Sequence, residues 1–169
     1  MTLLIVLAAN YLYLVVALIG LVTWLTRARA GRIVLGLTTV VAGVVGLLLI
    51  VVASSLYVDR RPFVSHHVQP LIPHAADNGF PSDHTTLAMV IALSVLTVSW
   101  RWGGLAVVAA LGVGVARVAA DVHSPLDIAG AVVIAVIAVA VGRLVAVRFR
   151  DQVDARLPGR APARADRRL

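Results

Sequence analysis

The sequence predicts an all-α integral membrane protein, a helical bundle with about five transmembrane helices. Of its 169 residues, 60% are hydrophobic and only 14% are charged, an apolar excess that a water-soluble domain of this size could not bury. Five apolar runs have lengths near the roughly 20 residues that a helix needs to cross a bilayer. The runs lie at 2–26, 33–58, 85–100, 103–121 and 126–147.

The first run, 2–26, begins without the basic segment that precedes the short apolar core of a cleaved signal peptide, so we expect it to remain as a helix. The third run, 85–100, only just reaches spanning length. Arg101 and the Gly103-Gly104 pair follow it and predict a tight turn into the fourth run. A single helix over 85–121 would instead place Arg101 in mid-bilayer, which is costly.

The segment from Asp59 to His84 is the one long polar connection between the runs. It contains four of the five histidines and four of the seven prolines, a composition typical of a shaped loop rather than a flexible linker. We expect His66, His67 and His74 to lie in this loop near the membrane surface. The alternative is that one of them contacts a bound substrate.

The arginines predict the orientation of the helices. All fifteen cationic residues are arginines, and those at 27–32, at 101 and in the last 22 residues fall on one side of a five-span protein, against Arg60 and Arg61 on the other. The positive-inside rule then places the N-terminus outside and the C-terminus in the cytoplasm.

Two regions follow from this pattern. We expect a transmembrane domain over 1–150 and an arginine-rich, disordered cytoplasmic tail over 151–169, which sets the topology and contacts anionic lipid. Nucleic-acid binding is not predicted, because no aromatic or groove-forming element accompanies the arginines. The absence of cysteine excludes disulfides, thiolate metal sites and a cysteine nucleophile.

The predicted topology brings three polar clusters to the outer face: Arg60-Arg61-Pro62, Pro81-Ser82-Asp83-His84, and Arg117 to Asp127. Guanidinium groups suit phosphate, because their planar fork donates paired hydrogen bonds and keeps its charge. The clusters therefore predict a phosphate pocket. Asp121, between two of its members, is expected to be a polar turn residue.

Two histidines could share the chemistry of phosphate transfer. An imidazole attacks phosphorus when a carboxylate holds its other ring nitrogen, and the spacing of His123 and Asp127 suits this. His84 is then the candidate acid for the leaving oxygen. Metal coordination by histidine and aspartate, snorkelling of Arg117 and pure helix capping by Asp127 are the alternatives.

Two helix starts are predicted beside the same pocket. Ser82 precedes the third run, and Ser124-Pro125-Leu126-Asp127 has a capping serine, a proline in the first turn and an acid three residues after the cap. Helix N-termini favour bound anions.

These clusters resemble the type 2 phosphatidic acid phosphatase superfamily, membrane lipid phosphatases with the motifs Lys-x6-Arg-Pro, Pro-Ser-Gly-His and Ser-Arg-x5-His-x3-Asp. Here the motifs read Arg61-Pro62, Pro81-Ser82-Asp83-His84, and Arg117, His123 and Asp127. The stretch GFPSDHT and the five spans are most similar to bacterial undecaprenyl-diphosphatases of the bacitracin-resistance type. Three substitutions depart from the motifs: Ser54 stands at the lysine position, Asp83 at the glycine and Ala116 at the serine.

The resemblance implies a role for each matching residue. His123 would be the nucleophile, Asp127 its orienting partner and His84 the acid. Arg61, Arg117 and Ser82 would bind phosphate, with Arg60 as a substitute for the missing lysine and Asp83 as a further contact. The resemblance implies no metal and no cofactor.

The sequence therefore predicts a multi-pass phosphatase of a bacterial plasma membrane with its active site on the outer face. It would hydrolyse undecaprenyl (polyprenyl) diphosphate through a phosphohistidine, and so recycle the carrier lipid of peptidoglycan synthesis. The alternatives are a phosphatidic acid or phosphatidylglycerophosphate phosphatase, and a non-catalytic membrane protein or small transporter that binds a phosphorylated lipid. The expected partners are the substrate and membrane lipids, and the oligomeric state is left open.

Overall fold

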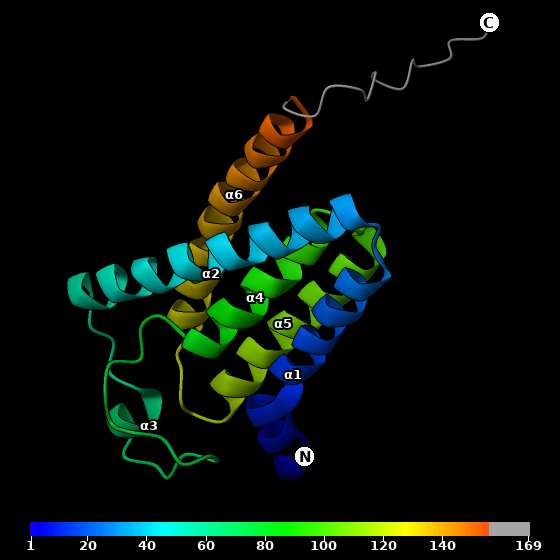
Figure 1. Cartoon of the computed structure of the whole chain (residues 1–169). Coiled ribbons are helices and arrows are strands. Elements are labelled where there is room, and N and C mark those ends of the chain that lie inside the picture. The colour runs from blue at the N-terminus through cyan, green and yellow to red at the C-terminus, as the bar shows by residue number, and fades with distance from the viewer. Residues whose placement is uncertain (156–169) are drawn as a thin grey trace, which may run out of the picture.

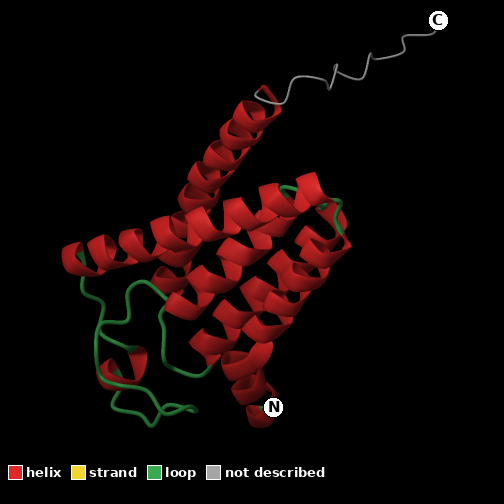
Figure 2. Cartoon of the chain, viewed as in Figure 1, coloured by secondary structure: helices red, strands yellow, loops and turns green. Residues whose placement is uncertain are grey.

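The structure, a computed structural model, describes residues 1–155, which form helices joined by loops and turns (Figures 1 and 2). The helices are α1 Thr2–Thr26, α2 Arg29–Leu56, α3 Pro62–Ser65, α4 Asp83–Leu96, α5 Trp100–Ala119 and α6 Pro125–Ala155. This part of the chain contains no strand, and its isolated β-bridge pairs Arg60 with Asn78. The predicted all-α bundle is confirmed.

The five predicted spans correspond to α1, α2, α4, α5 and α6. Four of them are long and apolar enough to cross a membrane, whereas α4 has 14 residues. At 1.5 Å per residue α4 is about 21 Å long, less than the hydrocarbon core of about 30 Å. Because α4 packs against α1, α2, α5 and α6, its backbone and side chains are largely shielded by protein.

Small residues pack the interior of the bundle, and large apolar residues cover its outside. Its buried core consists mainly of alanine and valine, and includes Ala42, Ala88, Ala106, Ala110 and Ala138. Large apolar side chains are exposed on the long helices, for example Leu18, Leu47, Val108 and Val133. This distribution is typical of membrane bundles, in which small residues allow close helix packing and large residues contact lipid.

Helices α2 and α6 form the most extensive contact of the bundle, and Gly142 lies where they approach closely. A Cβ atom at Gly142 would lie 2.5 Å from the carbonyl oxygen of Thr38 and 3.0 Å from the nitrogen of Ala42. The crossing therefore requires glycine at this position.

The turn between α4 and α5 differs from the prediction. The sequence predicts a turn at Arg101 and Gly103-Gly104, but α4 ends at Leu96, and Ser99 is the N-cap of α5. Arg101 and both glycines lie within α5. A Cβ atom at Gly103 would overlap the Cα of Leu96, so this glycine permits close helix packing rather than a turn.

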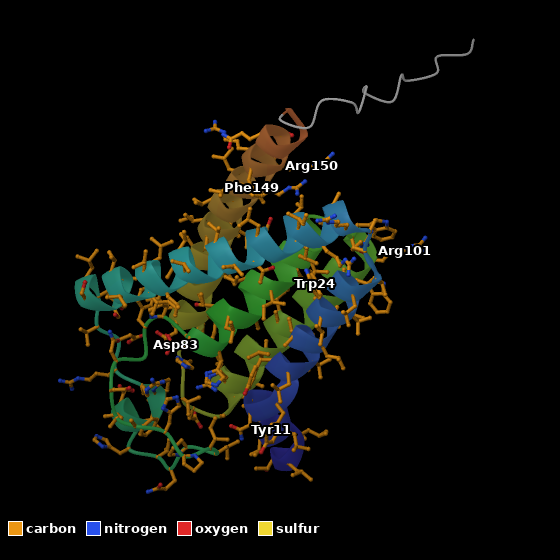
Figure 3. All side chains as sticks on the ribbon, in the orientation of Figure 1. Tyr11, Trp24, Asp83, Arg101, Phe149 and Arg150 are labelled. Atoms are coloured by element: carbon orange, nitrogen blue, oxygen red, sulfur yellow. The ribbon has the colours of Figure 1, made fainter. Side chains whose placement is uncertain are left out.

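The loops and turns separate into two ends of the bundle. The long loop with α3 lies at the same end as the N-terminus, and the C-terminal half of α6 projects beyond the opposite end (Figure 1). Asp83 and Tyr11 lie toward the loop end, whereas Arg101 and Arg150 lie toward the other (Figure 3). The predicted division of the polar segments between two ends agrees with this arrangement.

Helix α6 continues past the predicted domain boundary at residue 150, as far as Ala155. The remainder of the predicted arginine-rich tail, 156–169, lies outside the described residues.

We predict that Gly142→Ala destabilises the bundle by about 1–3 kcal/mol, the usual range for overpacking, because the added methyl must separate α2 from α6. Gly43→Ala is the matched control: Gly43 lies in α2, and a Cβ atom there would meet nothing within 4 Å. Thermal unfolding in detergent would measure both variants. Equal melting temperatures for Gly142→Ala and the wild type would contradict the close crossing.

Candidate active site

A polar pocket of about 310 Å³ lies where the long loop meets the ends of α2, α4 and α5. The residues that line it include Arg61, His74, Asp77, Asn78, Asp83, His84, Arg117 and His123, with Ile50 and Ser54 from α2. The structure thus brings together residues from all three predicted clusters. They converge because the loop folds back across the end of the bundle.

His123 is buried in the turn between α5 and α6, and both of its ring nitrogens have partners. Nδ1 lies 3.0 Å from the carbonyl oxygen of Gly79 and 3.2 Å from Oδ2 of Asp127. Since both oxygens only accept hydrogen bonds, Nδ1 carries the proton. The lone pair is then on Nε2, which lies 3.4 Å from Nη1 of Arg61.

Asp127 is fully buried in the first turn of α6 and links the helix start to His123. Its Oδ2 accepts a hydrogen bond from the backbone N–H of Ser124 at 2.7 Å, and its own N–H donates to Oγ of Ser124 at 3.3 Å. This is the predicted capping box. The same carboxylate therefore caps α6 and holds Nδ1 of His123.

Arg61 is buried at the N-terminus of α3, and three bonds fix the plane of its guanidinium. Nε donates to Oδ1 of Asp77 at 2.7 Å, Nη1 donates to the carbonyl oxygen of Val122 at 2.8 Å, and Nη2 donates to that of Asn78 at 3.3 Å. Its ion pair with Asp77 holds the pKa of that carboxyl group below its usual range. The cation is thereby positioned beside His123.

Arg117 is buried near the end of α5. Its Nη1 donates to the carbonyl oxygen of Ala9 in α1 at 3.3 Å, and its Nη2 lies 2.9 Å from Nε2 of His74. Its Nε is buried and has no hydrogen-bond partner among residues 1–155. The guanidinium therefore points into the bundle and the pocket rather than toward lipid headgroups.

His84 lies in the first turn of α4 and lines the pocket, in an edge-to-face contact with Tyr13 of α1 at 5.4 Å between ring centres. Asp83 is exposed on the same turn and also lines the pocket.

The other predicted phosphate-binding residues, Ser82 and Arg60, are not among the residues that line the pocket. Ser82 is fully buried as the N-cap of α4, and its Oγ pairs with Oγ1 of Thr85 at 3.0 Å. Arg60 is exposed and is not among the pocket residues. The structure therefore brings Arg61 to the pocket but not its neighbour Arg60. Asp121 has a positive φ of 60°, as suits a turn residue.

Asn78 is a residue that the sequence analysis missed. Its Oδ1 accepts from the N–H groups of Asp59 and Phe80, and its Nδ2 donates to the carbonyl oxygens of Ser54 and Tyr57. Three of these bonds tie the loop to the end of α2, and the fourth, from Phe80, lies within the loop. Together they position the neighbouring Gly79, whose carbonyl holds His123. The Asn-Gly pair, a typical turn signal, is the only trace of this role in the sequence.

Asp77 and Asp59 were also missed. Asp77 pairs with Arg61, and Oδ2 of Asp59 accepts from the hydroxyl of Ser124 at 2.7 Å. Both acids are separated from their partners by 16 to 65 residues, and no local pattern joins them. Across residues 1–155, no group of three or more histidines and acids is arranged to hold a metal ion.

Three bacterial proteins are similar in sequence to this chain over most of its length. Undecaprenyl-diphosphatase BcrC of Bacillus subtilis (strain 168) is 38% identical over 131 residues, 76% of this chain and 66% of that protein. Bacitracin transport permease protein BcrC of Bacillus licheniformis is 36% identical over 130 residues, 76% of this chain and 64% of its own. YbjG of Escherichia coli (strain K12) is 37% identical over 123 residues, covering 72% and 62%.

The chain thus spans slightly less than two thirds of the length of these curated relatives. A family model described as the PAP2 superfamily matches residues 33–151, which run from near the start of α2 into the last turns of α6 and include every residue that lines the pocket. This chain therefore belongs to the PAP2 superfamily.

Proposed function

We propose that this protein is a membrane lipid phosphatase that hydrolyses undecaprenyl diphosphate, or another polyprenyl diphosphate, to the monophosphate and inorganic phosphate. The observation that carries the proposal is the environment of His123. Its Nδ1 is held by Asp127 and Gly79, and its Nε2 lone pair lies beside the guanidinium of Arg61. An imidazole held in this way is a nucleophile next to an anion-binding group.

Two arginines would hold the terminal phosphate. Arg61 and Arg117 both line the pocket with His123. Guanidinium groups stabilise the charge that develops on the phosphoryl oxygens during transfer. The buried Asp127 would stabilise the positive charge that forms on the His123 ring.

In the first step, Nε2 of His123 attacks the terminal phosphorus, and the bond from that phosphorus to the bridging oxygen breaks. The lipid monophosphate leaves with the bond's electron pair, and His84 donates a proton to its oxygen. His84 lines the same pocket as His123, from the first turn of α4. The product is a phosphohistidine at His123.

In the second step, water attacks the phosphohistidine. His84, left neutral by the first step, accepts a proton from this water, and the phosphorus–nitrogen bond breaks to release inorganic phosphate. His123 and His84 return to their initial protonation states, so the cycle is balanced. Asp127 keeps Nδ1 of His123 protonated throughout.

The arginines support an active site on the outer face of a bacterial plasma membrane. Arg101 and Arg150 lie toward the end of the bundle opposite Asp83 (Figure 3). With the arginine-rich end in the cytoplasm, as the positive-inside rule favours, the pocket faces outward. At that face the protein would recycle the carrier lipid of peptidoglycan synthesis.

A non-catalytic role is the second candidate, because one relative is named as a bacitracin transport permease protein. A transport or binding protein has no need of the Asp127–His123–Arg61 arrangement. Turnover separates the two candidates.

We predict that the detergent-purified protein releases phosphate from undecaprenyl diphosphate in excess EDTA, and faster than from phosphatidic acid. His123→Ala should reduce release by about 10⁴-fold or more, as loss of a nucleophile does. Acid-labile, alkali-stable phosphate on His123, detected by mass spectrometry after rapid quenching, would report the intermediate. The exposed His66→Gln is the matched control and should retain activity.

Undiminished release by His123→Ala would contradict the phosphohistidine route. Faster release from phosphatidic acid would favour the alternative lipid substrates. No release from either lipid by the folded wild-type protein would favour binding or transport.

We predict that Asn78→Ala lowers kcat by about 10²-fold, since a misplacement of about 1 Å has this effect on a reacting group. The change removes the four bonds that position Gly79 and, through its carbonyl, His123. Steady-state kinetics would measure kcat beside Gln69→Ala, an exposed residue of the same loop. A kcat within twofold of the wild type would show that Asn78 does not position the nucleophile.

A further inference from the structure

His74 lines the pocket together with Arg61 and Arg117, and it belongs to none of the three motifs. Its Nε2 is 2.9 Å from Nη2 of Arg117, and its ring is perpendicular to that of His123 with 6.1 Å between centres. Since arginine only donates hydrogen bonds, Nε2 of His74 accepts. His74 is therefore a neutral imidazole with its proton on Nδ1.

The chain fixes His74 in this position. The preceding Leu71 donates its N–H to the carbonyl oxygen of Ala120 at 3.2 Å, and Ile72 is buried in a cluster with Ala9, Ala116, Ala120 and Val122. Pro73 restricts the backbone immediately before His74. His66 and His67 of the same loop are exposed. One loop histidine is thus anchored in the pocket.

The pocket has fewer cations than the family motif supplies. Ser54, at the lysine position, lines the pocket but is uncharged, and its hydroxyl donates to the carbonyl oxygen of Val51 in its own helix. Arg60 is exposed outside the pocket, and Arg61 is paired with Asp77. A terminal phosphate alone carries a charge of about −1.5 to −2 at pH 7.

We propose that His74 is a substrate-binding residue that takes up a proton when the diphosphate binds and contributes the cationic contact that Ser54 does not. This inference rests on the proposed function. A protonated His74 can no longer accept from Arg117, so both residues would donate to a phosphate oxygen placed between them. No bond other than these hydrogen bonds is made, and the proton comes from solvent.

The charges around His74 agree with such a change. Burial, followed by Arg61, Arg117 and His123, lowers the pKa of His74 to about 4, against a smaller opposing effect of Asp77. His84 and Asp83 are the other titratable groups of the pocket. A bound phosphate places negative charge beside the ring and raises this pKa.

The affinity for the diphosphate is expected to depend on pH, because binding adds a proton to His74. The bound form holds one more proton than the free form at any pH between the two pKa values of His74. Affinity for the diphosphate therefore falls as pH rises above about 4, until the pKa of the bound form is reached.

Three variants test the inference. His74→Gln keeps an acceptor for Arg117 but cannot become a cation, and we expect its KM for undecaprenyl diphosphate to rise about 10- to 100-fold, as for loss of a hydrogen bond to a charged group. His74→Lys carries a fixed cation, and we expect a KM near the wild-type value with a weaker dependence on pH. Ser54→Lys in the His74→Gln background should recover most of the lost affinity.

Proton uptake gives a readout that a structural role would not change. Calorimetric titration with methylenediphosphonate, in buffers of different ionisation enthalpy at pH 6.5, should give about one more proton taken up by the wild type than by His74→Gln, since one imidazole titrates. His66→Gln should match the wild type. Thermal unfolding of each variant separates loss of binding from loss of folding.

The inference would be overturned by equal proton uptake in wild type and His74→Gln, or by an unchanged KM. If His74→Gln and His74→Lys lose activity to the same extent and their melting temperatures fall equally, His74 has a structural role, and the inference is overturned. If the proposed function itself is wrong, the wild-type protein does not hydrolyse the lipid, and this outcome differs from those above.

Discussion

The buried carboxylate of Asp127 is the interaction on which the rest of the site depends. Its Oδ2 accepts from the N–H of Ser124 and from Nδ1 of His123. Its Oδ1 is buried without a hydrogen-bond partner among the described residues, so the burial of the carboxylate is compensated through Oδ2, by the start of α6 and by the imidazole. The start of α6 and the position of His123 therefore depend on the same carboxylate, so a change that disrupts the helix start also releases the His123 ring.

The packing of the bundle determines where the pocket residues of α4 lie. Small residues at helix contacts, such as Gly142 against α2 and Gly103 against the end of α4, allow the helices to approach closely. The short α4 lies among four longer helices and begins at the pocket. The titratable groups His84 and Asp83 are thus presented at a recessed helix end, where protein rather than lipid surrounds the polar side chains.

The long loop between α2 and α4 supplies several of the polar groups of the pocket. Arg61, His74 and the carbonyl of Gly79 all come from the segment between α2 and α4, which Asn78 ties to the end of α2 and Ile72 anchors against α5. Each cation in the pocket has a fixed partner: Asp77 for Arg61, and the carbonyl of Ala9 for Arg117. Preorganised donors of this kind need little rearrangement when an anion binds.

The sequence by itself determined the five main helices of the bundle, the capping box of α6 and the three clusters that meet at the pocket, although one of the five, α4, is shorter than the predicted span. These are local properties, since hydropathy, cap spacing and motif spacing are read over a few consecutive residues. Only the tertiary structure decided that Arg61 rather than Arg60 enters the pocket, that His74 is anchored there while His66 and His67 are exposed, and that Asn78 positions Gly79. It also moved the α4–α5 turn away from the glycines. Each of these depends on where the backbone is held by residues distant in the chain, and such contacts leave no periodic or spaced pattern in the sequence.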